Sequence, residues 1–446
     1  MIDTDIKKKE IIELFSKHSE KGLMINDKDE IIDLVNNLNF PDSKTEAWKK
    51  TDLGNILKHS YILGKKQDIP DEYINTFSFY ELETNRLVFV NGHYSEKYST
   101  VEVFNNKIIM GSIKESKLSH RNVFDNYFGK TGISKNSIFT ALNSAYAADG
   151  AFVYIPENTS LEKPIHIVNF VHGNNSKVIT QSRNLFILEK NTHASIINSY
   201  HSLSSDFTLN NVSTEIYTGE NANLKYFMFQ GEGNEASQIN HTFAEQNKGS
   251  SFKMNTSTLC GSTVRNEVFV DFKDEHCVAD LQGLYLPDKE QHVDNFISIR
   301  HSKPNCVSHQ LYKGIIDNKA QAVFTGKVYV AKDAQKTDAA QSNKNLLLTD
   351  NAKAFSRPQL EIYADDVSCA HGSTTGQIDT EALFYLKSRG IPERRAKTML
   401  MTAFVGDVLD KIDIKQYREY VKFLVDRRLK GQEVEGLCSV KICPNC

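Results

Sequence analysis

The sequence has few cysteines, no long apolar run and no excess of charge of either sign, and each shortage excludes a class of protein. Seven cysteines among 446 residues are too sparse for a disulfide-stapled secreted scaffold, so we expect reduced thiols and a cytoplasmic location. No apolar run reaches the ~18 residues that a membrane-spanning helix needs. The first residues show no apolar core followed by a small-residue cleavage site, so no secretory leader is expected.

The balanced charge argues against two classes of partner. The 53 basic and 56 acidic side chains give a net charge of −3, so neither nucleic acid nor an anionic membrane is expected to bind. A phosphate-binding loop is also lacking. Gly129-Lys130-Thr131 has the ending of such a loop, but Phe124 stands where the loop requires a glycine. The sequence therefore does not predict that this chain hydrolyses ATP.

The region from about Ala151 to Ala370 consists of short alternating apolar stretches separated by polar turns, which predicts strands. Small residues follow these turns at a regular interval. They are Ala194, Ala222, Ser250, Cys277 and Cys306, spaced by 28, 28, 27 and 29 residues, and then Ala320 and Ala334, each 14 residues further on. A sandwich or jelly roll would show irregular spacing and hairpin signals. The repeat favours a parallel β-helix with two equal sides per rung, in which each rung is buried by stacking on the next.

Both ends of the chain carry helical patterns, which would cap the solenoid. We predict an N-terminal helical or mixed region over 1–125, a β-helix over 126–372, a C-terminal helical domain over 373–436 and a tail over 437–446. Trp48 is expected to be half-buried. Asp379 and Asp413 are predicted helix N-caps, and Gly390 is predicted to end the first C-terminal helix.

The tail contains three thiols, Cys438, Cys443 and Cys446, in the pattern C-x4-C-x2-C. Three thiols are one short of a four-cysteine metal site. We interpret the segment as a mobile tail, with transient or dimer-bridged metal binding as the alternative.

Cys369 and His371 form the sharpest local signal for chemistry. Side chains at positions i and i+2 of a strand point to the same face, so the thiol and the imidazole are expected side by side. Both groups are good ligands for iron or zinc, although two ligands do not complete a site. On spacing alone, a buried cysteine and a hydrogen-bonded histidine with structural roles are the favoured explanation of the pair. Cys277, Cys306 and Cys260 are expected to be structural.

The neighbouring Asp365 and Asp366 suggest a rival reading as a carbohydrate-cleaving β-helix enzyme, which would use paired carboxyl groups. Adjacent residues on a strand point to opposite faces, a poor arrangement for two groups that share one substrate atom. The simpler interpretation is a pair of solvated acids at a strand end.

The stretch from Arg357 to Gly376, RPQLEIYADDVSCAHGSTTG, closely resembles the signature of the SufB/SufD family, and of its SufD branch in particular. The match continues through residues 384–391, FYLKSRGI, with weaker echoes at residues 46–49 and 90–92. SufB-type chains tend to carry a cysteine cluster toward the N-terminus. The first cysteine here is Cys260, which favours the SufD branch. Nothing in the resemblance extends to the tail thiols.

The resemblance implies a fold, a set of partners and a site. The fold is a right-handed parallel β-helix flanked by N-terminal and C-terminal α-helical regions. The implied function is that of a non-catalytic scaffold subunit in a complex of SufB, SufD and two copies of the ATPase SufC, which assembles iron–sulfur clusters. SufC would dock on the C-terminal helices, about 379–429. SufB would meet the β-helix near 357–372, and ATP-driven closure would open this interface to iron and sulfur.

Within that interface, His371 matches the family's functional histidine, an expected ligand of iron or of a nascent cluster. Cys369 matches the neighbouring cysteine, and SufB would supply the remaining ligands. The resemblance leaves a flavin in the complex open, and no motif of this sequence indicates one. Two alternatives also stay open, a SufB-like homodimer that builds a cluster alone and the carbohydrate enzyme.

Overall fold

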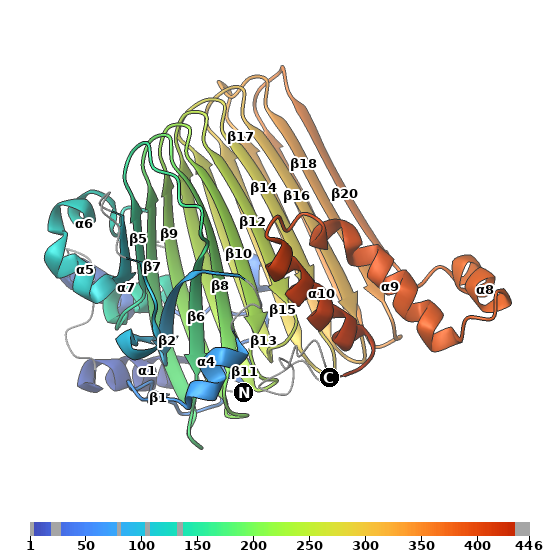
Figure 1. Ribbon diagram of the computed structural model, residues 1–446, viewed down its shortest axis with the longest axis horizontal. Helices are drawn as coiled ribbons and strands as arrows, with labels where there is room; N and C mark the ends of the chain where they lie inside the picture. The colour runs from blue at the N-terminus through green and yellow to red at the C-terminus, as the bar shows by residue number, and fades with distance from the viewer. Residues whose placement is uncertain (1–3, 19–27, 78–81, 103–107, 132–136, 433–446) are drawn as a thin grey trace.

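The computed structural model describes residues 4–18, 28–77, 82–102, 108–131 and 137–432. Most of this chain winds into a solenoid whose strands alternate between two long sheets, so that each rung adds one strand to each sheet (Figure 1). Neighbouring strands of the solenoid are parallel and in register along their length. The parallel β-helix with helices at both ends confirms the predicted fold class.

The two sheets are built from alternate strands of the chain. The first contains β4 (Ile109–Ser112), β5 (Ala151–Ile155), β7 (Val178–Leu188), β9 (Thr208–Thr218), β11 (Ala236–Gln246), β13 (Thr263–Phe272), β15 (His292–His301), β17 (Gln321–Val330) and β19 (Lys353–Ile362), with β1 (Ile62–Leu63) beside β7. The second contains β3 (His93–Tyr94), β2 (Asn85–Val90), β6 (Ile165–Val171), β8 (His193–Ser202), β10 (Asn223–Gly231), β12 (Ser251–Thr258), β14 (Val278–Tyr285), β16 (Val307–Ile316), β18 (Asp338–Leu347) and β20 (Ser368–Gly376). Segments on both sides of the predicted 125/126 boundary thus contribute to the sheets.

One corner of the solenoid repeats a left-handed residue followed by a small buried one. The left-handed residues include Asn191, Asn221, Gly249, His276 and Asn305, with φ between 53° and 66°. Glycine and asparagine tolerate this conformation best. Asparagines at this corner also bond from rung to rung, since Asn191 donates its side-chain N–H to Asn158 at 2.8 Å and Asn221 donates to Asn191 at 3.2 Å.

The small residue after the left-handed position is Ala222, Ser250, Cys277 or Cys306 in successive rungs, as predicted. The prediction was wrong for the rungs of Ala194 and Ala334, where the register places Thr192 and Thr337 at the corner. Threonine fits there because its hydroxyl satisfies a nearby backbone carbonyl. Thr192 Oγ1 donates to the carbonyl of Glu189 at 2.6 Å, and Thr337 Oγ1 donates to that of Ala334 at 2.9 Å.

The N-terminal end of the solenoid is covered by short helices. They are α1 (Thr4–His18), α2 (Lys28–Asn37), η1 (Glu46–Trp48), α3 (Gly54–Leu57), α4 (Asp71–Thr76), η2 (Glu96–Tyr98), α5 (Ile113–Ser119), α6 (Arg121–Tyr127) and α7 (Ile138–Tyr146). Every residue of α7 is buried, between α2 and the outer face of the first sheet. Trp48 is only 6% exposed, so the prediction of a half-buried ring was wrong. The Trp48 ring stacks on Phe139, and the Arg265 guanidinium lies over the same ring, 3.9 Å from the ring centroid.

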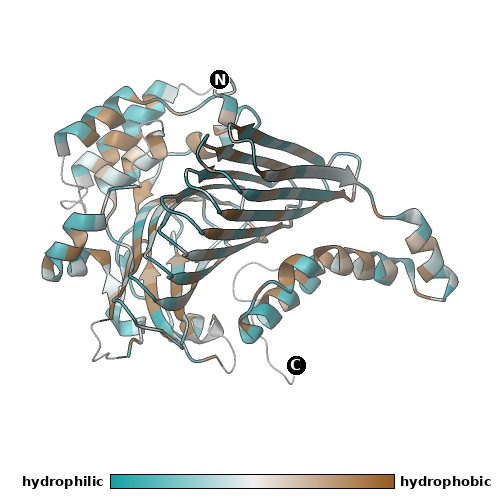
Figure 2. Ribbon diagram, turned by 90° about the horizontal axis from the view of Figure 1, so that it is seen from above, coloured by the Kyte–Doolittle hydropathy of each residue, from teal (hydrophilic) through white to brown (hydrophobic). Residues whose placement is uncertain are grey.

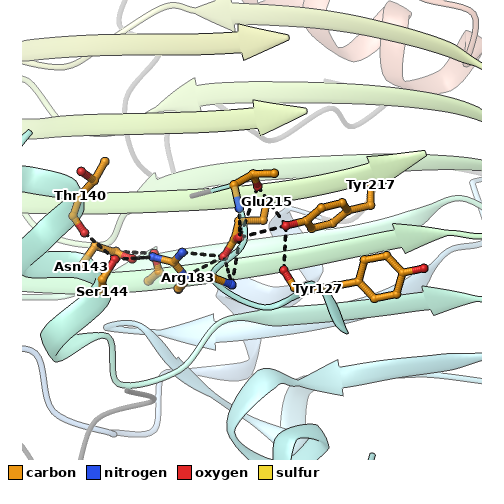
Figure 3. A network of polar contacts seen from close by, with 10 residues as sticks. Tyr127, Thr140, Asn143, Ser144, Arg183, Glu215 and Tyr217 are labelled. Carbon is orange, nitrogen blue, oxygen red and sulfur yellow. Dashed lines mark hydrogen bonds and ion pairs between the residues drawn. The ribbon is translucent and has the colours of Figure 1, made fainter. Parts of the chain in front are cut away.

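A buried ion pair joins α7 to the first sheet (Figure 3). Arg183 on β7 contacts Glu215 on β9 at 2.5 Å, and Arg183 also donates to Ser144 on α7 at 3.0 Å. The backbone N–H groups of Gly129 and Thr131 donate to the same carboxylate at 3.1 and 3.3 Å. The segment that imitates a phosphate loop therefore covers a buried carboxylate, and hydrogen bonds satisfy the charge that burial would otherwise destabilise.

Three helices follow the solenoid: α8 (Thr380–Ser388), α9 (Glu393–Leu409) and α10 (Lys415–Leu429). Helices α9 and α10 pack on the outer face of the second sheet through one shared apolar cluster. Lys313 on β16 fixes α9 by contacting Asp407 at 2.7 Å. Helix α8 stands clear of the solenoid beyond its last strand (Figures 1 and 2), and none of its residues is buried. Within the described ranges, every helix is too short or too polar to cross a membrane.

The caps of the C-terminal helices were predicted with one error. Asp379 caps α8 by accepting from the N–H groups of Glu381 and Ala382 at 2.9 and 3.0 Å, and Gly390 follows α8 with φ +79°. Asp413 does not cap α10. Its carboxylate instead contacts Lys225 and Lys253 of the second sheet at 2.9 and 3.0 Å, which ties the start of α10 to the solenoid.

The buried Glu232 beside β10 gives a testable pH dependence. Burial raises the pKa of its carboxyl from 4.5 to about 8, although a hydrogen bond from Asn210 acts in the opposite direction. Between these two values the folded chain keeps a proton that the unfolded chain has released, so the free energy of unfolding falls as pH rises.

Glu232→Gln removes this titration while keeping an acceptor for Asn210. We expect the variant to be more stable than the wild type at pH 8.5 by on the order of a few kcal/mol, and nearly equal to it at pH 5. Urea unfolding at both pH values measures the difference. An equal difference at the two pH values would contradict a proton held by Glu232.

Candidate metal site at the open end of the solenoid

The two sheets end at β19 and β20, and these last strands differ from the solenoid strands β5 to β18 that precede them. Among the residues that the structure describes, each is paired along one edge only, β19 with β17 and β20 with β18. From Ala370 to Gly376 every residue of β20 is exposed, although the equivalent positions of β18 alternate between buried and accessible. In the described part of the chain, no further rung or helix covers this end. The solenoid is therefore capped at its N-terminal end and open at the other.

Cys369 and His371 lie on β20 and face the interior of the solenoid. Their register partners on β18 are Ala339 and Gln341, which are 1% and 3% exposed. Register partners in a parallel sheet share a face, so both side chains point inward. That they lie on one face is what their spacing predicts. Cys369 is half-buried against a small apolar cluster that includes Ala339, whereas His371 is exposed at the mouth. The strand rise places the two residues about 7 Å apart along β20.

The thiol of Cys369 is protonated in the isolated chain at neutral pH. Burial, and secondarily the charge of Asp338, raises the pKa of Cys369 above its ordinary value of 9.0. A metal that binds this sulfur must therefore displace its proton. Among the residues that the structure describes, no group of three His, Cys, Asp or Glu side chains is arranged to hold a metal ion. Any site here thus needs ligands beyond the two on β20.

The edges of both last strands are free to pair. Ser368 donates its N–H to the carbonyl of Thr337, the residue before β18. Cys369, His371 and the alternate residues after them therefore turn their backbone N–H and C=O groups to the open edge. Just after β19, the N–H of Tyr363 donates to the carbonyl of Val330 on β17. By the same alternation, the backbone of Pro358 faces the open edge and not β17. Proline fits at such a position because no bond to β17 is lost there.

Two segments that are far apart in sequence meet beside this edge. Arg357 on β19 forms an ion pair with Glu46 of η1, and its guanidinium also donates to the carbonyl of Glu46 at 3.4 Å. The hydrogen bond and charge of Arg357 lower the pKa of Glu46. Lys50 lies over the ring of Phe355, 4.4 Å from its centroid. The N-terminal segment thus braces the outer face of the last rungs.

The remaining candidate residues do not join this site. Asp365 and Asp366 lie in the turn between β19 and β20 and not on a strand, so the prediction that a strand separates their faces was wrong, and both are exposed. Cys260, Cys277 and Cys306 are buried. The thiols of Cys277 and Cys306 both donate to the carbonyl of Asp274, at 3.2 and 3.3 Å, a structural role. Cys438, Cys443 and Cys446 lie outside the described residues.

The arrangement agrees with comparisons to known families. The SufBD core domain of the SUF system for iron–sulfur cluster assembly matches residues 170–404, and the SufBD N-terminal region matches residues 8–167. The chain belongs to the SufBD family. Together the two regions of the SufBD family span the solenoid and the N-terminal cap, so the family assignment rests on the whole scaffold as well as on the signature near Cys369.

Individual SufBD relatives match over nearly their whole length. A SufBD family protein from Synechocystis sp. is 31% identical over 404 residues, 89% of each chain. The iron–sulfur cluster assembly protein SufD of Escherichia coli is 27% identical over 398 residues, 88% of this chain and 90% of its own. SufD of Bacillus subtilis is 24% identical over 430 residues, 94% and 98% of the two chains. This SufBD chain is therefore an iron–sulfur cluster assembly protein.

Sequence reasoning missed the residues that lie behind His371 inside this SufBD solenoid. The register places Gln341 one rung behind His371 and Gln310 one rung behind Gln341. Spacings of 30 and 31 residues link the three, which differ from the 27 to 29 residues that separate the predicted small residues Ala194 to Cys306. A rung-by-rung alignment of polar residues predicted to face inward would have found them.

Proposed function

We propose that this chain is the SufD-type, non-catalytic subunit of a complex with a SufB-type chain and two copies of a SufC-type ATPase. The observation that carries the proposal is the position of Cys369 and His371, two metal-binding side chains on the interior face of the last strand of an open solenoid. A metal site shared between two chains requires that each chain present part of the ligand set on a surface where the other chain can join it. Cys369 and His371 on the unpaired last strand meet this requirement.

The SufB-type partner would continue both sheets. A second solenoid that pairs with β19 and β20 would satisfy their free backbone groups, since an exposed sheet edge is a template for another strand. The exposed Ile362 and Tyr363, which are 39% and 60% accessible, lie at the end of β19 and would become buried. Joining the two solenoids would also enclose Cys369 and His371 at the junction.

Iron or a nascent cluster would be the cargo of this junction. His371 would supply an imidazole nitrogen and Cys369 a thiolate, and the partner would supply the remaining ligands of a four-ligand set. His371 is the better placed of the two, because it is exposed at the mouth, whereas Cys369 is half-buried and protonated. The proton of Cys369 would leave as the metal binds.

The SufC-type ATPase would dock on the C-terminal helices. Phe384 and Tyr385 on α8 are 74% and 56% exposed, and Met399 on α9 is 44% exposed. Exposed aromatic and methionine side chains are typical anchors of protein interfaces. A hollow of 800 Å³ adjoins Met399 and includes Pro392, Ala403 and Gln432. Because α9 and α10 pack on the second sheet, movement of the ATPases would be passed to the solenoid.

Anaerobic isolation of the tagged chain from its native cells, with subunits identified and iron and sulfide measured, tests this function. We expect a SufB-type chain and a SufC-type ATPase to co-purify with it. Isolation of the chain alone, together with a stoichiometric cluster that forms on it and depends on Cys369, would favour the homodimeric scaffold instead. The two outcomes require different partner compositions, so one experiment separates them.

A further inference from the structure

The interior column behind His371 contains two glutamines that the fold leaves unsatisfied. Gln310 and Gln341 are 2% and 3% exposed, and none of the four polar atoms in their side chains has a hydrogen-bond partner within the described chain. Buried amides are normally paired, because an unpaired one costs free energy. In the same rung, Asn343 and Asn345 are paired, with each other and with Tyr285. On β16 and β18, the buried side-chain atoms without a partner are those of Gln310 and Gln341, the column that ends at His371.

The carboxamide of Gln341 reaches across the interior to the first sheet. A Cβ added to Gly326 on β17 would lie 3.0 Å from Gln341 Oε1, so the absence of a side chain at Gly326 makes room for the amide. The next rung places His371 beside Gln341 in the second sheet and Pro358 beside Gly326 in the first. The backbone of His371 therefore lies one strand spacing, about 4.8 Å, from the backbone of Gln341, and the two side chains share the inner face.

Side chains one rung apart already form hydrogen bonds elsewhere in this interior. Asn266 donates to Asn295, its register partner, at 3.1 Å. A histidine that binds a metal commonly donates its other ring N–H to an acceptor behind it, which fixes the tautomer and the direction of the ligand nitrogen. Gln341 has an unused acceptor at the corresponding place.

We propose that Gln341 is a positioning residue whose side-chain oxygen accepts the ring N–H of His371, so that the other ring nitrogen points out of the mouth. Gln310 lies one rung further from the mouth in the same column, and water molecules make the hydrogen bonds that the two amides do not make with protein groups. This inference rests on the proposed role of His371 as a ligand. The inference adds to that role a buried residue on β18, Gln341, which orients the ligand that β20 supplies.

The test uses Gln341→Leu, which removes the acceptor, and Gln341→Glu, which keeps one. Gln282→Leu is the matched control, because Gln282 is also buried and unpaired but lies on the outer face of the second sheet. The chain is labelled with ¹⁵N-histidine, and the His371 signals are assigned as those lost in His371→Ala. The ratio of its two neutral tautomers is measured at pH 8.5.

We expect Gln341→Leu to change the tautomer ratio of His371 by about fivefold, as the loss of one hydrogen bond implies, whereas Gln341→Glu and Gln282→Leu leave one tautomer dominant. In the assembled complex, Gln341→Leu should also weaken ferrous iron binding by about 10–100-fold. An unchanged ratio in a folded Gln341→Leu chain would overturn the inference. If the ratio shifts while His371→Ala leaves iron binding intact, Gln341 still positions His371, and the proposed ligand role falls instead.

Discussion

His371→Ala is expected to weaken iron binding by the anaerobically purified complex by more than about 100-fold, while the complex stays assembled. Loss of a hydrogen-bond partner behind a ligand costs about 10–100-fold in metal affinity, so loss of the ligand itself should cost more. Assembly should survive because the partner would pair with β20 through its backbone, and His371 is exposed in the isolated chain. Iron per complex, measured together with subunit stoichiometry, reports both effects.

His309→Ala is the matched control for this substitution. His309 is an exposed histidine on β16 of the same sheet, but its register partner on β18 is Ala340, so it lies on the outer face. The complex that contains His309→Ala should bind iron like the wild type. Cys369→Ser should lower iron binding less than His371→Ala, because the Cys369 thiol must first lose its proton. Full iron content in the His371→Ala complex would remove His371 from the ligand set.

Ser373→Pro is expected to prevent assembly with the SufB-type chain. Ser373 lies on β20 at a position whose N–H faces the open edge, by the same alternation that turns Ser368 toward β18. Proline there removes an edge donor and places its ring where a partner strand would lie, without removing a bond to β18. The lost hydrogen bond and the steric conflict together should weaken the free energy of binding to the partner by more than about 1.4 kcal/mol. Recovery of the partner should therefore fall at least ~tenfold.

Ser373→Ala serves as the control, because it removes the hydroxyl and keeps the edge N–H. The thermal unfolding midpoint of each isolated variant shows whether the solenoid itself is intact. A folded Ser373→Pro chain that still recovers its SufB-type partner in full would mean that the two solenoids do not join along β20. Recovery of the ATPase should be unaffected by either variant, since its proposed surface lies on α8 to α10.

The regular parts of the fold were predictable because stacking repeats the same local demands in every rung. Each corner needs a left-handed residue and a compact side chain, and this requirement appears in the sequence at Ala222, Ser250, Cys277 and Cys306. The common face of Cys369 and His371 follows from the two-residue period of a strand. Where threonine replaces a small residue at a corner, as at Thr192, the apparent period shifts although the fold does not.

The contacts between distant segments could not be predicted in the same way. The ion pair of Glu46 with Arg357 joins residues 311 positions apart, and no local pattern encodes it. Asp413 has the pattern of a cap, but two lysines of the second sheet bind it instead. Gln341 becomes visible only when the register aligns it with His371, because rungs differ in length and an interior column keeps no fixed spacing.

The most direct test of the shared site is pulsed electron paramagnetic resonance on the assembled complex. Only this chain would carry ¹⁵N-histidine, and the cluster would be brought to a paramagnetic state without oxygen. We predict a hyperfine coupling typical of a directly bound ¹⁵N that is present in the wild type and in His309→Ala and absent in His371→Ala. A cluster that shows no such coupling, or a coupling that persists in His371→Ala, would contradict a site completed by the open end of this solenoid.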